Sequence, residues 1–181
     1  MKSTCTAPYW FEPSELITSR LRLRAYSEPD LDDFVSLMSN ADVNRYVANG
    51  PMRRSDAIAL FGRIFSIYKE RRFAVWAVEN RASRESIGHA ELKPRPGQSG
   101  LEMIYLLQQS AWGRGLGTEL VQLLRDHAMR ALGCRRVFAT IHPENEASRR
   151  VLAKLGFRLV REWLEPGDNV LTCLWAVEAE Q

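Results

Sequence analysis

The sequence predicts an α/β fold of the α+β kind, in which strands and helices follow one another within one domain. Three observations predict it. The segment Thr18–Arg24 alternates polar or charged residues with leucines, and this period of two is typical of a half-buried strand. Apolar residues in the segment 116–132 recur every three or four positions, as in an amphipathic helix. An apolar run typical of a strand, Leu101–Leu107, precedes that helix.

Length and composition favour a single soluble domain. The chain has 181 residues, 45% hydrophobic and 26% charged, which is ordinary for a globular protein with a substantial core. Its net charge of +3 is too small to indicate a nucleic-acid partner. No apolar run approaches the ~20 residues of a membrane span, and no apolar segment follows the N-terminus, so we expect a cytoplasmic protein. Cys5, Cys134 and Cys173 match no metal-ligand spacing, so we expect reduced thiols and no metal site.

The elements can be placed in order along the chain. Residues 1–15 are expected to form an N-terminal arm, whose aromatic residues 9–11 pack on the rest of the chain, and residues 16–181 a single domain. Two helices should follow the first strand, one capped by Ser27 or Asp30 and one at Ser55–Arg71. The remaining segments are expected as strands at Phe73–Glu79, Ile87–Lys93 and Leu101–Leu107, a helix ending at Gly133, a strand at Arg135–His142, a helix at Asn145–Leu155, and strands at Phe157–Leu164 and Val170–Val177.

A glycine-rich loop opens the central helix. Gly113, Gly115 and Gly117 alternate directly after the strand Leu101–Leu107. Without side chains, such a loop lets backbone N–H groups approach an anion, and the positive end of the helix favours the same charge. Phosphate or diphosphate is therefore the expected ligand, and a loop that is merely flexible is the alternative. The sequence lacks the Gly-Lys-Ser/Thr of a P-loop and the Gly-x-Gly-x-x-Gly spacing of a dinucleotide fold.

A second motif lies at residues 145–157. Taken locally, Asn145 is a good N-cap, the apolar positions belong to a core, and Gly156 ends the helix. The same string is similar to Asn-x-x-Ser-x-x-x-Leu-x-x-Leu-Gly-Phe of the GNAT N-acetyltransferases. The segment Trp112–Gly117 likewise resembles the acetyl-CoA loop of that family, Arg/Gln-x-x-Gly-x-Gly/Ala. The first position departs from the Arg or Gln of this pattern, because Trp112 occupies it. That departure, and the segment Thr18–Arg24, resemble the RimJ/RimL-like branch, the ribosomal-protein alanine N-acetyltransferases and their relatives.

The resemblance implies a fold and a cosubstrate. It implies a mixed, mostly antiparallel seven-stranded sheet flanked by helices, in the order β-α-α-β-β-β-α-β-α-β-β. The strands at Leu101–Leu107 and 136–142 should splay apart to admit acetyl-CoA (coenzyme A). Amides of the glycine loop would then hold the diphosphate. The residues implied in cofactor binding are Leu106, Leu107, Trp112, Gly113, Arg114, Gly115, Leu116, Gly117, Thr118, Asn145 and Ser148.

The resemblance also implies catalytic roles. The backbone N–H of Leu107 or Leu106 would face the thioester carbonyl. Many GNAT enzymes carry a tyrosine seven residues after the motif asparagine, but this position is Leu152, so Ser148 is the candidate acid. Glu102, on the central strand, is the candidate general base, an outward-facing surface charge being the alternative; Glu162 and Glu165 are further candidates for the base. Of the histidines only His142, at a strand end, is expected near the site. Arg149 or Arg150 could meet the nucleotide phosphates, although they are as readily solvated helix charges.

The acceptor is expected to be a protein or peptide N-terminal amine. An α-amine titrates near ~8 and a lysine amine near ~10.4, so only the second requires a strong base, and no strong base constellation is visible. Two alternatives stay open: acetylation of a small amine, which Glu162, Glu165 and Asp168 could attract, and acyl-CoA binding without catalysis. The expected partners are therefore acetyl-CoA and an amine, without nucleic acid or membrane, with a homodimer as a possible assembly.

Overall fold

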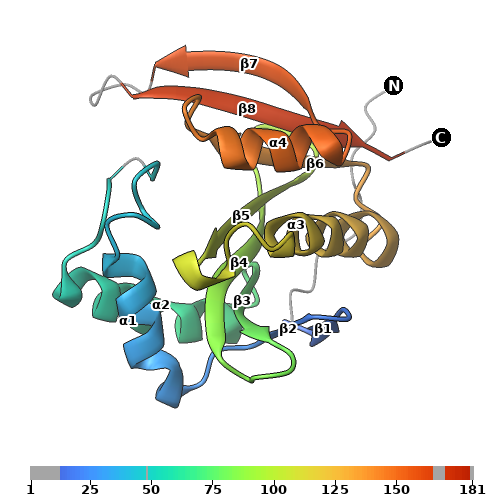
Figure 1. Ribbon diagram of the computed structural model, residues 1–181. Helices are drawn as coiled ribbons and strands as arrows, with labels where there is room; N and C mark the ends of the chain where they lie inside the picture. The colour runs from blue at the N-terminus through green and yellow to red at the C-terminus, as the bar shows by residue number, and fades with distance from the viewer. Residues whose placement is uncertain (1–12, 48, 165–169, 180–181) are drawn as a thin grey trace.

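The computed structural model describes residues 13–47, 49–164 and 170–179. In them, eight strands form one sheet in the order β1-β2-β3-β4-β5-β6-β8-β7 (Figure 1). Neighbouring strands run antiparallel, except that β5 and β6 are parallel. The strands are β1 (Leu16–Ile17), β2 (Leu21–Arg24), β3 (Ala74–Asn80), β4 (Ser86–Pro94), β5 (Leu101–Leu107), β6 (Arg136–Ile141), β7 (Arg158–Leu164) and β8 (Leu171–Glu178). The expected α/β (α+β) fold is confirmed.

In the described residues, four α-helices cover the sheet from two sides. Helices α3 (Leu116–Asp126) and α4 (Glu146–Lys154) pack on the face we call the inner face, where they form the main core with the central strands. Helices α1 (Leu31–Ser39) and α2 (Arg54–Glu70) pack on the outer face, over β3 and β4. Gly133 is predicted to end the central helix. It has a φ of 63° and lies between the helical residues, which end at Ala131, and β6. Among the described helices, none has the length and apolar character needed to cross a membrane.

The opening segment differs from the expected single strand. It folds into the short hairpin β1–β2, because the Thr18 hydroxyl accepts a hydrogen bond from the Leu21 amide at 2.8 Å and closes a turn at residues 18–20. The sheet therefore has eight strands and not seven, while the rest of the predicted order is confirmed. Leu21 and Leu23 are fully buried, as the alternation predicted. The aromatic residues 9–11 of the arm lie outside the described residues.

Strands β5 and β6 separate partway along their length. Their pairing joins residues 101–103 to residues 137–139 and goes no further, although β5 continues to Leu107 and β6 to Ile141. At the paired end the backbones approach closely: a Cβ on Gly100 would lie 2.4 Å from the carbonyl oxygen of Arg136. The divergence expected between these strands is thus present, and it leaves a gap in the middle of the sheet.

Candidate active site

The glycine loop connects β5 to α3 in a conformation that glycine favours. Gly113 and Gly115 have φ angles of 68° and 76°, in the left-handed region, and Gly115 is the N-cap of α3. A Cβ on Gly113 would meet nothing within 4 Å, so backbone conformation and not space requires the glycine. The first amides of α3 have no partner inside the helix, and the loop presents them at the cleft beside it.

That cleft, which we call the glycine-loop cleft, has a volume of about 480 Å³ and lies between β5, the loop and α4. Nine of the predicted residues line it: Leu106, Leu107, Trp112, Gly113, Gly115, Gly117, Thr118, Asn145 and Ser148. The other two do not. Leu116 is 3% exposed and belongs to the main core, and the Arg114 side chain is exposed outside the cleft. Arg114 and Leu116 can therefore contribute only through their backbone N–H groups.

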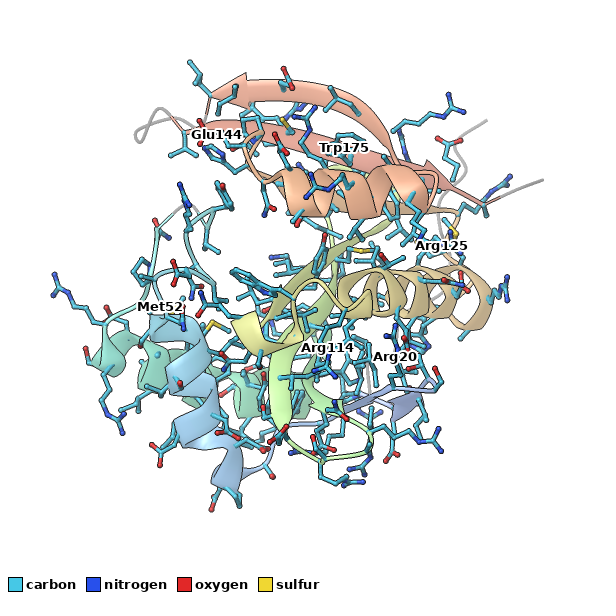
Figure 2. All side chains as sticks on the ribbon, viewed as in Figure 1. Arg20, Met52, Arg114, Arg125, Glu144 and Trp175 are labelled. Carbon is cyan, nitrogen blue, oxygen red and sulfur yellow. The ribbon has the colours of Figure 1, made fainter. Side chains whose placement is uncertain are left out.

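The loop is fixed from outside by the β1–β2 turn. Arg20 donates to the Arg114 carbonyl oxygen at 2.7 Å and to the Glu119 carboxylate at 2.6 Å, and Figure 2 shows Arg20 beside Arg114. Thr18 donates to the other Glu119 oxygen at 2.5 Å. Burial raises the pKa of Glu119, but the hydrogen bonds from Thr18 and Arg20 outweigh it, so the pKa is lower than usual. Arg20 is thus not a freely solvated strand charge: it ties the N-terminal hairpin to the loop.

The end of β5 directs one amide into the gap. The Gln108 amide donates to Ile87 of β4 at 2.8 Å. Successive amides of an extended chain point to opposite edges, so the Leu107 N–H points away from β4 and the Leu106 N–H points toward it. The Leu107 carbonyl oxygen, on the same edge as its N–H, accepts a hydrogen bond from the Trp112 indole at 2.8 Å. Leu107, rather than Leu106, is the residue whose amide can face a ligand.

A second cavity, the strand-gap cavity, occupies the space between the diverging strands. Its volume is about 490 Å³, and it continues into the glycine-loop cleft. His142 lines it and stacks on Tyr46, with ring centroids 5.6 Å apart and planes at 26°. His142 is therefore placed as expected, at the site. The residues that line both spaces are Val43, Tyr46, Tyr105, Leu106, Asn145 and Ser148.

Glu102 lines the strand-gap cavity and not the cleft. One of its oxygens accepts hydrogen bonds from Arg95 at 2.8 Å and from Thr140 at 2.5 Å. It is the only carboxylate among the described residues that line this cavity. Glu162 lies elsewhere: it accepts a hydrogen bond from Cys173 at 3.2 Å, and burial together with this contact raises the Cys173 pKa to about 11. The other candidates, at positions 165 and 168, lie outside the described residues.

Helix α4 places Ser148 at the junction of the two spaces. The Asn145 side chain accepts a hydrogen bond from the Ser148 amide at 3.1 Å and so caps the helix, as predicted. Leu152, at the position of the family tyrosine, is fully buried in the core. Arg149 donates to the Pro143 carbonyl oxygen at 3.3 Å, and Arg150, which lines the glycine-loop cleft, pairs with Glu146 at 3.1 Å.

Tyr105 is a site residue that the sequence interpretation missed. Its hydroxyl is buried at the junction, next to the Ser148 side chain, without a hydrogen bond of good geometry. Burial raises the pKa of Tyr105 to about 12, so the phenol stays protonated at neutral pH. The signal was available: Leu101, Met103 and Leu107 share the inner face with position 105, where a hydroxyl among apolar residues is unusual.

The other two histidines are explained by packing. His89 is 3% exposed and lies between the Tyr26 hydroxyl and the Glu91 carboxylate, each 3.0 Å from a ring nitrogen. His127 packs edge-on against the Trp76 ring, and burial lowers its pKa. Neither residue lines the cleft or the strand-gap cavity.

A family model and a related protein both indicate the same family. The model of the acetyltransferase (GNAT) domain matches residues 20–158. The uncharacterized N-acetyltransferase YoaA of Bacillus subtilis is 32% identical over 149 residues, which are 79% of this chain and 82% of that protein.

Solved structures agree at the level of the fold. RimJ of Mycobacterium smegmatis, in complex with CoA-disulfide, superposes with a TM-score of 0.79 at 19% identity, over 92% of this chain and 88% of that one. Spermidine N-acetyltransferase of Vibrio cholerae, in complex with CoA and spermine, superposes with a TM-score of 0.76 at 19% identity, over 89% of this chain and 96% of that one. At 19% identity these structures show the fold alone and do not identify the amine acceptor of this chain.

Replacing Gly115 by valine should weaken the binding of coenzyme A. A β-branched residue at this φ is strained by about 1–3 kcal/mol, and relief of the strain would move the loop amides. We expect the dissociation constant, measured by calorimetry, to rise by about tenfold or more. Gly97→Val is the matched control, since Gly97 has a φ of 71° in a turn far from the cleft. Equal affinities of both variants and the wild type for coenzyme A would show that the loop does not contribute to cofactor binding.

Proposed function

The chain belongs to the GNAT acetyltransferases, which take their acetyl group from acetyl-CoA, and on this premise we propose that its acceptor is the N-terminal α-amine of a protein or peptide. The observation that carries the proposal is the composition of the strand-gap cavity. Its one described carboxylate, Glu102, is already engaged by Arg95 and Thr140, so the described part of the lining offers no cluster of acids for a polycation. A single amine next to apolar walls fits this lining better.

The glycine-loop cleft suits the cosubstrate. Acetyl-CoA supplies the acetyl thioester when it is bound. The amides of residues 113–118 would hold its diphosphate, and the loop is kept in shape by Arg20 and Glu119. Asn145 and Ser148, on α4, would line the path of the thiol end toward the junction.

The residues at the junction fit direct transfer of the acetyl group. The amine nitrogen would attack the thioester carbon, forming the C–N bond while the carbonyl oxygen gains charge. The Leu107 N–H would stabilise that oxyanion. Glu102 would accept the proton that the amine loses, directly or through water. As the C–S bond breaks, the Tyr105 hydroxyl would give its proton to the departing sulfur, and Ser148, beside it, would return a proton to the phenolate from solvent.

Two other functions are alternatives to the peptide acceptor. A small amine could also enter the strand-gap cavity, because about 490 Å³ is enough to enclose one. RimJ and spermidine N-acetyltransferase resemble the chain equally well in identity, so the fold does not choose between acceptors. Binding of acyl-CoA without catalysis is disfavoured, since the family consists of acetyltransferases.

Thiol release from acetyl-CoA should discriminate between the acceptors. We expect turnover with peptides that carry a free N-terminus, and little with N-terminally blocked peptides that contain lysine, with polyamines or with aminoglycosides. The kcat/KM should rise with pH as the α-amine deprotonates near ~8. Turnover of small amines alone would refute the peptide acceptor, and tight cofactor binding without turnover on any amine would refute the transferase.

Tyr105→Phe should lower kcat without lowering stability. The Tyr105 hydroxyl makes no hydrogen bond that folding would lose, and loss of a proton donor typically costs about 100-fold or more in rate. Since the pKa of Tyr105 is about 12, the wild type should show no alkaline loss of kcat/KM up to about pH 10. Tyr68→Phe is the control: its hydroxyl bonds the Tyr26 amide and the Val75 carbonyl oxygen, so stability should fall by about 1 kcal/mol while kcat stays. Equal kcat values in both variants would exclude Tyr105 as the acid.

Glu102→Gln should reduce kcat/KM for the peptide acceptor by about 100-fold near pH 7. The loss should shrink as pH rises, because more of the amine is already neutral before it attacks and hydroxide can take the proton that the nitrogen loses afterwards. Glu162→Gln, which changes a carboxylate outside the strand-gap cavity, serves as the control. A pH–rate profile for Glu102→Gln that coincides with the wild type would exclude the role.

A further inference from the structure

On the outer face of β6, β8 and β7, arginines lie around an apolar centre in which Phe138 and Leu174 are fully buried. Strand pairing places these outward-facing residues side by side across three strands: Arg136, Phe138 and Thr140 of β6, Thr172, Leu174, Ala176 and Glu178 of β8, and Arg158, Arg161 and Trp163 of β7. We call this surface the open face. Its apolar cluster consists of strand residues alone, whereas α1 and α2 pack farther along, over β3 and β4. Within the described part of the chain, no helix covers it.

The charge of the open face is positive. Arg136 lies 3.4 Å from Glu178, but Arg158 and Arg161 are exposed and have no carboxylate within ion-pair distance among the described residues. The Arg161 guanidinium lies over the Trp163 ring, 4.6 Å from its centroid, which holds the charge in place on the sheet. Of the described strand residues on this face, three are thus arginines and one is a glutamate.

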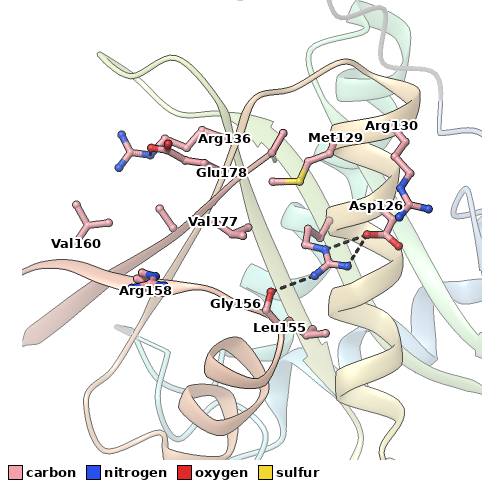
Figure 3. A pocket seen from close by; sticks show the side chains of 13 residues that line it. Asp126, Met129, Arg130, Arg136, Leu155, Gly156, Arg158, Val160, Val177 and Glu178 are labelled. Atoms are coloured by element: carbon pink, nitrogen blue, oxygen red, sulfur yellow. Dashed lines mark hydrogen bonds and ion pairs between the residues drawn. The ribbon is translucent and has the colours of Figure 1, made fainter. Parts of the chain in front are cut away.

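The open face begins at the candidate active site. Thr140 and Thr172 line the strand-gap cavity, and Glu102 is paired in register with Phe138. At its other end lies a hollow of about 760 Å³, shown in Figure 3, with Arg136, Arg158 and Glu178 on its wall. A chain that enters the strand-gap cavity with its amine first therefore leaves it across a basic surface.

We propose that the open face is the docking surface for an acidic segment of the protein acceptor, a few residues after the acetylated amine. The proposal rests on the proposed peptide acceptor. Arg161 is two strand spacings from Thr140, or about 10 Å, and Arg158 is slightly farther. An extended peptide advances about 3.3 Å per residue, so acidic residues at about positions 4 to 6 reach these arginines.

An acidic peptide fits better than a nucleic acid. A duplex carries one charge per about 1.7 Å and is held by a larger basic footprint than two unpaired arginines. The net charge of the whole chain is only +3. The Trp163 ring under the Arg161 guanidinium, and the continuity with the strand-gap cavity, also favour a polypeptide.

The test compares ten-residue peptides that share their first three residues and carry Asp, Gln or Lys at positions 4 to 6. The measurement is kcat/KM for the wild type, for the double variant Arg158→Glu/Arg161→Glu, and for the control Arg63→Glu/Lys69→Glu, which changes two exposed charges on α2. We expect the wild type and the control to prefer the Asp peptide. The variant should lose about tenfold or more with the Asp peptide and gain with the Lys peptide, at unchanged kcat/KM for a dipeptide amide.

Other outcomes would overturn the docking surface alone, or the docking surface together with the proposed peptide acceptor. Equal turnover of the three peptides by the wild type, or the same preference in the Arg158/Arg161 variant, would overturn the docking surface and leave the proposed function intact. Turnover of small amines without any peptide would overturn both. Stronger inhibition by a single-stranded oligonucleotide than by the Asp segment alone would assign the face to nucleic acid and refute the acidic partner.

Discussion

The separation of β5 from β6 is the constraint on which the site depends. Two parallel strands that stop pairing after residues 103 and 139 leave backbone groups without a sheet partner. Such groups must be satisfied by a ligand, by water or by side chains, because an unpaired buried amide is costly. The Trp112 indole satisfies the Leu107 carbonyl oxygen, and the Leu107 amide remains directed at the gap. The same divergence opens the cleft on one side and the strand-gap cavity on the other.

The two spaces meet at one junction, where we propose that transfer occurs. A cosubstrate anchored at the loop and an amine entering from the opposite side can approach each other only at the junction lined by Tyr105 and Ser148. Apolar strands surround that junction, which strengthens the effect of the few polar groups in it. The loop is also held away from the junction: Arg20 contacts Glu119 and the Arg114 carbonyl oxygen, and so joins the N-terminal hairpin to the glycine loop.

The two sides of the site differ in how well the sequence predicts them. On the proposed cofactor side, the features that matter are backbone conformations, which are encoded locally: Gly113 and Gly115 require positive φ, and Asn145 caps its own helix. On the acceptor side, the lining comes from segments distant in sequence, such as Tyr46, Glu102 and His142. Glu102 could be identified from its strand, but its contacts with Arg95 and Thr140 could not.

The sequence by itself determined the order of the elements and the two motifs, because period, glycine spacing and caps act over a few residues, and the family followed from the resemblance of those motifs to the GNAT N-acetyltransferases. It also predicted the inward leucines of the first segment, although not the turn that divides it. Only the tertiary structure decided that Tyr105 places an unbonded hydroxyl beside Ser148, and that Arg158 and Arg161 lie on the same face of the sheet as Thr140, which lines the strand-gap cavity. The physical reason is that these facts depend on which strands become neighbours, and strand pairing brings together residues that no local pattern connects.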